Sequence, residues 1–116
     1  MQQITDIPIA GIYFSHSRIR PRFSGNGRAL CATLADLATG ACAPSSLPRA
    51  TIIALSSGRL VSLSNRRLWV FKELLRAHPA RLPGGTLRAL LRPATAREEK
   101  RLAGPLSLRA TLLRGA

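Results

Sequence analysis

A β-hairpin that runs directly into an amphipathic helix constrains the fold of this chain most strongly. Residues Arg49–Leu55 and Arg59–Leu63 are rich in aliphatic and β-branched side chains, and Ser56–Gly58 between them has the composition of a tight turn. A pattern of helical period follows over Asn65–Ala77 and ends before Pro79. We therefore expect a sheet with at least one helix packed on it.

The residues before this unit predict a strand, a basic loop and a helix. Residues Ile7–Phe14 have the apolar pattern of a strand, and a polar and basic loop follows over Ser15–Asn26. Leucines at i, i+4 and i+7 predict a helix over Arg28–Thr39, which Gly40 is placed to end in the left-handed conformation. We expect Cys31 on this helix to be a small buried hydrophobic residue.

The residues after the unit add a strand and a third helix. Residues Thr86–Arg92 fit a strand or a short helix, of which the strand is favoured. Thr95 and Glu98 have capping-box spacing, so a helix should begin near Ala96 and end before Gly104. The last twelve residues carry an apolar pattern that we leave unassigned. At 116 residues the chain suits a single α+β (mixed α/β) domain, with a small mixed sheet flanked by helices.

The charge balance points to a polyanionic partner. Eighteen Lys and Arg residues oppose five Asp and Glu residues, which gives a formal net charge of +13. Such a chain attracts nucleic acid, either RNA or DNA, or a nucleotide, and an anionic membrane surface is the second candidate. The excess of Arg over Lys, together with abundant Ala, Leu, Gly and Pro, also fits compositional bias, in which case part of the basicity is incidental.

Several functional classes lack a signal in the sequence. Cys31 and Cys42 have no metal-binding spacing, and His16 and His78 have no spaced catalytic partner. Trp69 lies next to the apolar stripe of its helix, so we expect a half-buried core residue rather than a platform for bases. No apolar run approaches the roughly 20 residues of a membrane span, and no secretory signal is visible. We expect a soluble intracellular protein that is not secreted.

The junction between the hairpin and its helix is the first candidate site. Four successive residues form it: Ser64, Asn65, Arg66 and Arg67. Ser64 is a plausible N-cap, but two arginines stand at the positive end of the helix dipole, which is unfavourable for cations. Free backbone N–H groups and two guanidinium groups together suit a phosphate. The structural alternative is that one arginine pairs with Asp36 or Glu73 and the other is solvated.

The basic loop is the second candidate site. Arg18, Arg20 and Arg22 alternate, so in an extended loop their side chains would point to one side at a spacing of about 6.6 Å. That spacing suits a run of phosphates, and Pro21 favours the extended form at the residue before it. His16 lies close to these arginines and is a further candidate contact. The alternative is a solvated loop of incidental basic content.

The residues at the junction also suggest a family. The stretch Ser64-Asn65-Arg66-Arg67-Leu68-Trp69, followed by Lys72 and preceded by a hairpin and an earlier helix, resembles the ParB N-terminal/sulfiredoxin-like superfamily. Residues Ile12–Ser24, Asp36–Gly40 and Ser46–Pro48 also resemble that group. The resemblance covers about residues 7–92, which would form the core, and residues 93–116 would form a basic C-terminal extension.

The resemblance implies a compact mixed α/β domain in which the box Ser64–Arg67 holds the phosphates of a nucleoside triphosphate. The nucleotide is CTP in ParB proteins and ATP in related kinases and sulfiredoxin. Asn65 stands where the ParB box has an acidic residue and where sulfiredoxin has its catalytic cysteine. The resemblance therefore implies phosphate binding without the reductase activity of sulfiredoxin.

Three functional hypotheses follow. The first is a non-catalytic module that binds nucleic acid or nucleotide phosphates through the Asn-Arg-Arg box and the basic loop. The second is a structural, RNA-bound component of a ribonucleoprotein assembly, in which arginines of the C-terminal third matter equally: Arg88, Arg92, Arg97, Arg101, Arg109 and Arg114. The third is a small nucleotide hydrolase or kinase of the ParB-like type. The scarcity of acidic metal ligands argues against the third.

Overall fold

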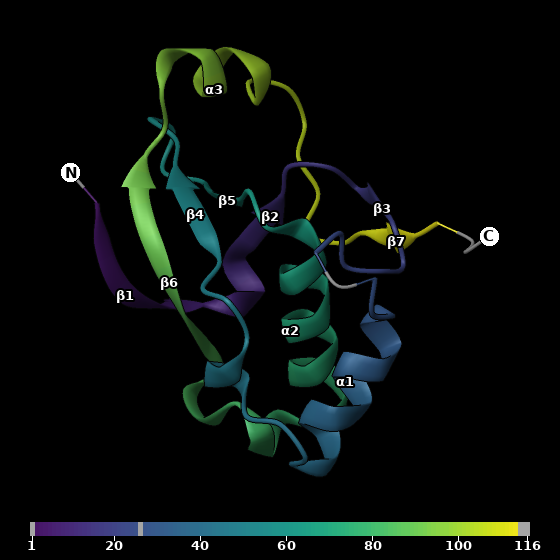
Figure 1. Cartoon of the computed structure of the whole chain (residues 1–116). Helices are drawn as coiled ribbons and strands as arrows, with labels where there is room; N and C mark the ends of the chain where they lie inside the picture. Colours follow the sequence, from purple (N-terminus) through teal and green to yellow (C-terminus); the bar gives the residue numbers. More distant parts are fainter. Residues whose placement is uncertain (1, 26, 114–116) are drawn as a thin grey trace.

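Two sheets and three helices make up the α+β fold of this computed structural model, which describes residues 2–25 and 27–113 (Figure 1). The larger sheet has the spatial order β1 (Gln3–Pro8), β6 (Thr86–Pro93), β4 (Thr51–Ala54), β5 (Leu60–Ser62) and β2 (Ile12–Phe14). It is mixed: β1–β6 and β4–β5 are antiparallel, whereas β4–β6 and β2–β5 are parallel. The smaller sheet pairs β3 (Arg18–Ile19) with β7 (Thr111–Leu112), and the helices are α1 (Leu30–Thr39), α2 (Asn65–Ala77) and α3 (Ala96–Arg101).

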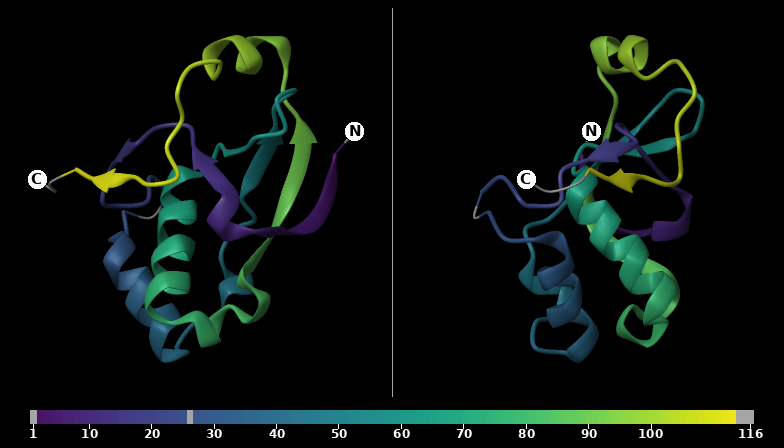
Figure 2. Two further views of the ribbon diagram at one scale, coloured as in Figure 1. Left: turned by 180° about the vertical axis from the view of Figure 1, so that it is seen from behind. Right: turned by 90° about the vertical axis from the view of Figure 1, so that its right-hand side faces the viewer.

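The central strand β4 shows how the larger sheet buries both of its faces. Ile52 packs in the main core with Leu37 of α1 and Leu68 of α2, whereas its neighbour Ile53 packs with Leu102 in a second cluster. Successive side chains of a strand point to opposite faces, so α1 and α2 cover one face and the chain just after α3 covers part of the other. Figure 2 shows α1 and α2 side by side, with α3 well apart from them.

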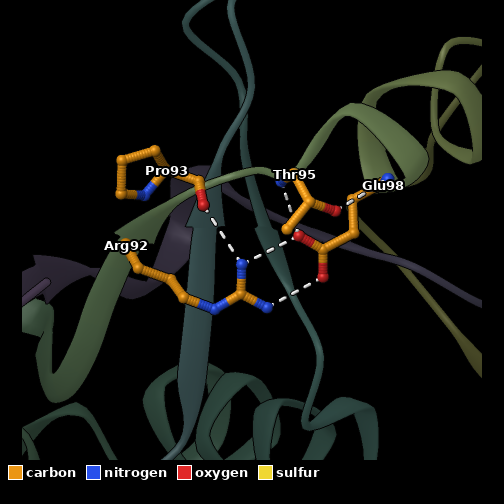
Figure 3. Close-up of polar contacts among 4 residues, drawn as sticks. All are labelled: Arg92, Pro93, Thr95 and Glu98. Atoms are coloured by element: carbon orange, nitrogen blue, oxygen red, sulfur yellow. Dashed lines mark hydrogen bonds and ion pairs between the residues drawn. The ribbon is translucent and has the colours of Figure 1, made fainter. Parts of the chain in front are cut away.

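The end of β6 and the start of α3 are joined by a polar network (Figure 3). Thr95 Oγ1 accepts a hydrogen bond from Glu98 N at 3.2 Å, and Glu98 Oε1 accepts one from Thr95 N at 2.9 Å, which confirms the predicted capping box. Both carboxylate oxygens of Glu98 also accept hydrogen bonds from the Arg92 guanidinium, each at 2.8 Å. The hydrogen bonds from Arg92, and next the backbone of Thr95, lower the pKa of Glu98 to about 2.

The chain after α3 returns to the basic loop and pairs with it. Lys72 Nζ of α2 donates to Leu108 O at 2.8 Å, and Thr111 N of β7 donates to Ser17 O at 2.7 Å. The stretch left unassigned from the sequence therefore contains a short strand, β7, which pairs with β3 of the basic loop. Residues 114–116, including Arg114, lie outside the described residues.

Several predicted elements are confirmed. Helix α2 spans Asn65–Ala77 as predicted, β4 and β5 form the predicted antiparallel hairpin, and Thr86–Pro93 is a strand. Gly40 has a φ of 82° at the end of α1, the left-handed conformation that glycine adopts without strain. Trp69 is half-buried against the main core. No helix among the described residues is both long and apolar enough to cross a membrane.

The prediction of one strand over Ile7–Phe14 is wrong. The chain forms β1, then a 3-10 turn over Ile9–Gly11, and then β2 at the opposite edge of the sheet. Ile9 and Ile12 are both fully buried, so the apolar pattern continues through the turn and conceals it. The predicted loop over Ser15–Asn26 is also interrupted, because it contains β3; Asn26 itself lies outside the described residues.

The prediction that Cys31 is buried is wrong, because its side chain is exposed. The buried residues of α1 are Leu30, Thr33 and Leu37, and Leu34 and Ala38 pack against the core beside them. Cys31 follows Leu30 by one residue, which turns it about 100° around the helix and away from that face. Cys42 is partly buried, and both cysteines are free thiols.

Candidate phosphate-binding site

A cavity of about 760 Å³ lies where the basic loop meets the N-terminal end of α2. Seven of the eight predicted site residues line it, although they come from two segments far apart in the sequence. They are His16, Arg18 and Arg20 from the basic loop, and Ser64, Asn65, Arg66 and Arg67 from the junction. The fold thus brings the two candidate sites together into one.

Arg22 is the predicted site residue that does not line the cavity. Its guanidinium donates to Gly27 O at 3.0 Å, and the backbone around it bends into a short turn in which Phe23 N donates to Arg28 O. The extended conformation that would align three alternating arginines therefore ends before Arg22. Arg18 and Arg20 therefore line the cavity, whereas Arg22 is bonded to Gly27 and does not.

The lining of the cavity is strongly cationic. The guanidinium groups of Arg18 and Arg20 are exposed, and neither forms a hydrogen bond or ion pair with any described residue. Among the described lining residues Asp36 is the one carboxylate, and it forms an ion pair with Arg28, which also lines the cavity. This acid is therefore already neutralised, and the remaining arginines are left without a counter-charge.

Arg66 and Arg67 do not pair with Asp36 or Glu73, which was the structural alternative. Nη1 of Arg66 instead donates to Arg22 O at 2.9 Å, whereas Asp36 and Glu73 are bonded to other arginines. A guanidinium has five N–H donors, so this single bond leaves most of the Arg66 donors available. The bond also ties the basic loop to α2.

Arg67 has a comparable arrangement on the other side of the cavity. Its Nη1 donates to Pro48 O at 2.8 Å and to Arg49 O at 2.9 Å, which fixes the chain just before β4. Burial, and next the positive charge of Arg66, lower the pKa of Arg67 from its usual value. An anion beside these two neighbouring cations would relieve both effects, because it would stabilise the charged form of each.

Ser64 and Asn65 are held by the scaffold. Ser64 stands at the N-cap position, but its Oγ accepts from Thr51 N at 3.3 Å and does not cap α2, so the predicted side-chain cap is wrong. Asn65 Oδ1 accepts from Ser15 N at 3.0 Å, and Asn65 Nδ2 donates to Ser15 Oγ at 2.9 Å. The first N–H groups of a helix have no partner within it, and here no side chain caps them.

Sequence reasoning missed the rest of the lining. Arg28 was predicted to begin a helix, but α1 begins at Leu30, so Arg28 lies in the segment before the helix and borders the cavity. Part of the wall is apolar and includes Phe23, Leu47 and Leu63. No pattern in the sequence separates these from ordinary core residues. The lining of the cavity thus combines cationic and apolar side chains.

Comparison with protein-family models, with curated proteins and with solved structures found no match to this chain. The resemblance to the ParB N-terminal/sulfiredoxin-like superfamily therefore stays a prediction.

Proposed function

We propose that this protein is a non-catalytic module that binds the phosphate groups of a nucleotide or of nucleic acid in the cavity at the N-terminal end of α2. The observation that carries the proposal is the convergence of uncompensated cations on one cavity. Arg18 and Arg20 come from one segment, and Arg66 and Arg67 come from another more than forty residues later. Asp36, the acid that lines the cavity with them, is paired with Arg28.

The chemistry of the lining suits a phosphate group. Guanidinium groups bind phosphate through two parallel N–H···O bonds, and the uncapped N-terminus of α2 adds backbone donors of the same polarity. Arg66 and Arg67 are oriented in advance by their bonds to backbone carbonyls, so little side-chain entropy is lost when a ligand binds. CTP and ATP are included among the probes because of the ParB/sulfiredoxin-like resemblance.

The test is fluorescence anisotropy with labelled single-stranded RNA, labelled DNA, and labelled CTP and ATP. The principal variant is Arg18→Gln/Arg20→Gln, because these exposed side chains form no hydrogen bond or ion pair with described residues and their loss should leave the fold intact. Loss of two charge-assisted contacts should weaken binding by at least about tenfold. The matched control is Arg97→Gln/Arg101→Gln, which removes the same charge from the exposed surface of α3.

The same pair of variants separates this proposal from the second candidate, a structural component of a ribonucleoprotein assembly. That candidate is favoured by exposed arginines outside the cavity, such as Arg97, Arg101 and Arg109. If the α3 control weakens RNA binding as much as the cavity variant, the charge acts as a whole and the cavity is not the site. Unchanged binding in the cavity variant would contradict the proposal directly.

A further inference from the structure

Each of the five carboxylates of this chain already has a partner. Asp36 pairs with Arg28, Asp6 with Arg88, Glu73 with Arg76, and Glu98 with Arg92. The fifth is Glu99, whose Oε2 accepts a hydrogen bond from Ser56 N at 2.8 Å. All five residues are described, so no Asp or Glu side chain of the chain is left unengaged to offer a cation.

The cavity itself is poorly suited to a divalent cation. Mg²⁺ at nucleotide sites is held by one or two carboxylates together with oxygens of the substrate phosphates. Asn65 presents an amide, and its oxygen accepts hydrogen bonds from both Ser15 N and Ser15 Oγ. Among the described residues, no group of three or more His, Cys, Asp or Glu could hold a metal ion. The surrounding arginines repel a cation further.

We propose that the cavity takes a polyphosphate group in its metal-free form, so that Mg²⁺ competes with the protein for the ligand. This inference rests on the proposed function and specifies the form of its ligand. The arginines of the cavity supply the positive charge that a bridging Mg²⁺ supplies at other phosphate sites. A phosphate chain wrapped around Mg²⁺ has fewer free oxygens and less negative charge, so the guanidinium groups bind it more weakly.

The experiment is isothermal titration calorimetry of the full chain with inorganic tripolyphosphate. One buffer contains EDTA, and the other contains MgCl₂ in excess over the ligand, with NaCl added to the first so that the ionic strengths are equal. We expect binding in EDTA that is weakened by at least about tenfold in Mg²⁺. Binding that is equal or tighter in Mg²⁺ overturns this inference and leaves the proposed function intact.

A control experiment distinguishes failure of this inference from failure of the proposed function. The Arg18→Gln/Arg20→Gln variant is titrated in both buffers, and the difference between the buffers should shrink with the loss of affinity in EDTA. If the wild-type chain binds neither tripolyphosphate nor ATP nor RNA in either buffer, the proposed function falls and this inference falls with it. If Mg²⁺ weakens binding by the same factor in the variant as in the wild type, the inference is also overturned. The ligand that competes with Mg²⁺ would then be bound outside the cavity.

Discussion

Arg67 illustrates how single residues at this site have two tasks. Its Nη1 is committed to the carbonyls of Pro48 and Arg49, while the rest of its guanidinium remains available in a cavity rich in positive charge. Arginine can do both because its donors are spread over a rigid planar group, whereas lysine concentrates its donors on one nitrogen. Charge alone therefore does not describe what this position requires.

The first prediction concerns the difference between arginine and lysine at position 67. Arg67→Lys keeps the net charge but has one nitrogen to share between two carbonyls and a ligand, so phosphate affinity should fall by about fivefold or more. Arg97→Lys on the exposed surface of α3 is the matched control and should bind like the wild type. Anisotropy with labelled ATP in EDTA measures both. Wild-type affinity in Arg67→Lys would indicate that a positive charge at this position is sufficient and that the planar guanidinium is not required.

The second prediction concerns Glu98, whose pKa is lowered to about 2 by the hydrogen bonds from Arg92 and by the backbone of Thr95 (Figure 3). A carboxyl with a depressed pKa stabilises the fold above its unfolded pKa of about 4.3, and this contribution is lost as the pH falls toward about 2. The melting temperature should therefore decrease from about pH 5 to about pH 2 more steeply in the wild type than in Glu98→Gln.

Thr95→Ala provides an independent check on the same network. It removes the side chain that accepts from Glu98 N and should cost about 1 kcal/mol of stability at neutral pH. Thermal unfolding followed by circular dichroism measures this variant and Glu98→Gln. Parallel pH profiles for the wild type and Glu98→Gln would show that the Arg92–Glu98 pair does not contribute to stability.

At the scale of elements, the C-terminal strand β7 positions one wall of the cavity without lining it. It pairs in parallel with β3, which carries Arg18, and Lys72 of α2 bonds the chain just before β7. Burial lowers the pKa of Lys72 to about 8. Its ammonium also lies 5.5 Å from the centre of the Phe14 ring, whose face attracts a cation. We therefore expect the position of Arg18 in the cavity to depend on β7.

The third prediction tests that dependence. Thr111→Pro removes the N–H that donates to Ser17 O and should loosen the segment that carries Arg18. Phosphate binding should weaken by up to about fivefold, the limit set by one lost backbone hydrogen bond of ~1 kcal/mol. Thr111→Ala keeps the N–H and changes only an exposed side chain, so it should bind normally. Calorimetry with tripolyphosphate compares the two. Equal affinities would mean that the basic loop keeps its position without β7.

At the scale of the whole molecule, the net charge of +13 is divided between one cavity and the remaining surface. Four arginines in the cavity, Arg18, Arg20, Arg66 and Arg67, have no carboxylate partner. Other arginines, including Arg88 and Arg92, are paired with acids elsewhere on the surface. The total charge therefore overstates the number of phosphates that one ligand contacts at the site.

The fourth prediction is that the salt dependence of RNA binding reflects the four cavity arginines and not the whole net charge. If single-stranded RNA is bound through the four cavity arginines, a plot of log K against log [NaCl] should have a slope of about −3, that is, about −0.7 for each neutralised phosphate. Anisotropy titrations over a range of NaCl concentrations measure the slope. A much steeper slope would indicate contacts spread over the whole surface, as the ribonucleoprotein hypothesis requires.

The parts of the fold that the sequence predicted are those defined by local chemistry. Periodicity placed α2 at Asn65–Ala77, the i, i+3 spacing of Thr95 and Glu98 placed the start of α3, and Gly40 marked the end of α1. Each of these signals arises within a few residues, where the hydrogen-bonding partners are also neighbours in the chain. The arginines of the junction and of the basic loop were found in the same way, as dense local charge.

What the sequence could not supply were contacts between distant residues. The turn at Ile9–Gly11 was hidden because Ile9 and Ile12 are both buried and continue the apolar pattern through it, and β7 was unassigned because two residues pair only with a distant loop. Residue types and their spacing alone thus defined the helices, the hairpin and two separate clusters of cations. That the clusters share one cavity, that Arg22 is excluded from it, and that Asn65 is bonded to Ser15, fifty residues away, follow from chain packing. Local patterns carry no information about such packing, because it depends on which distant surfaces bury one another.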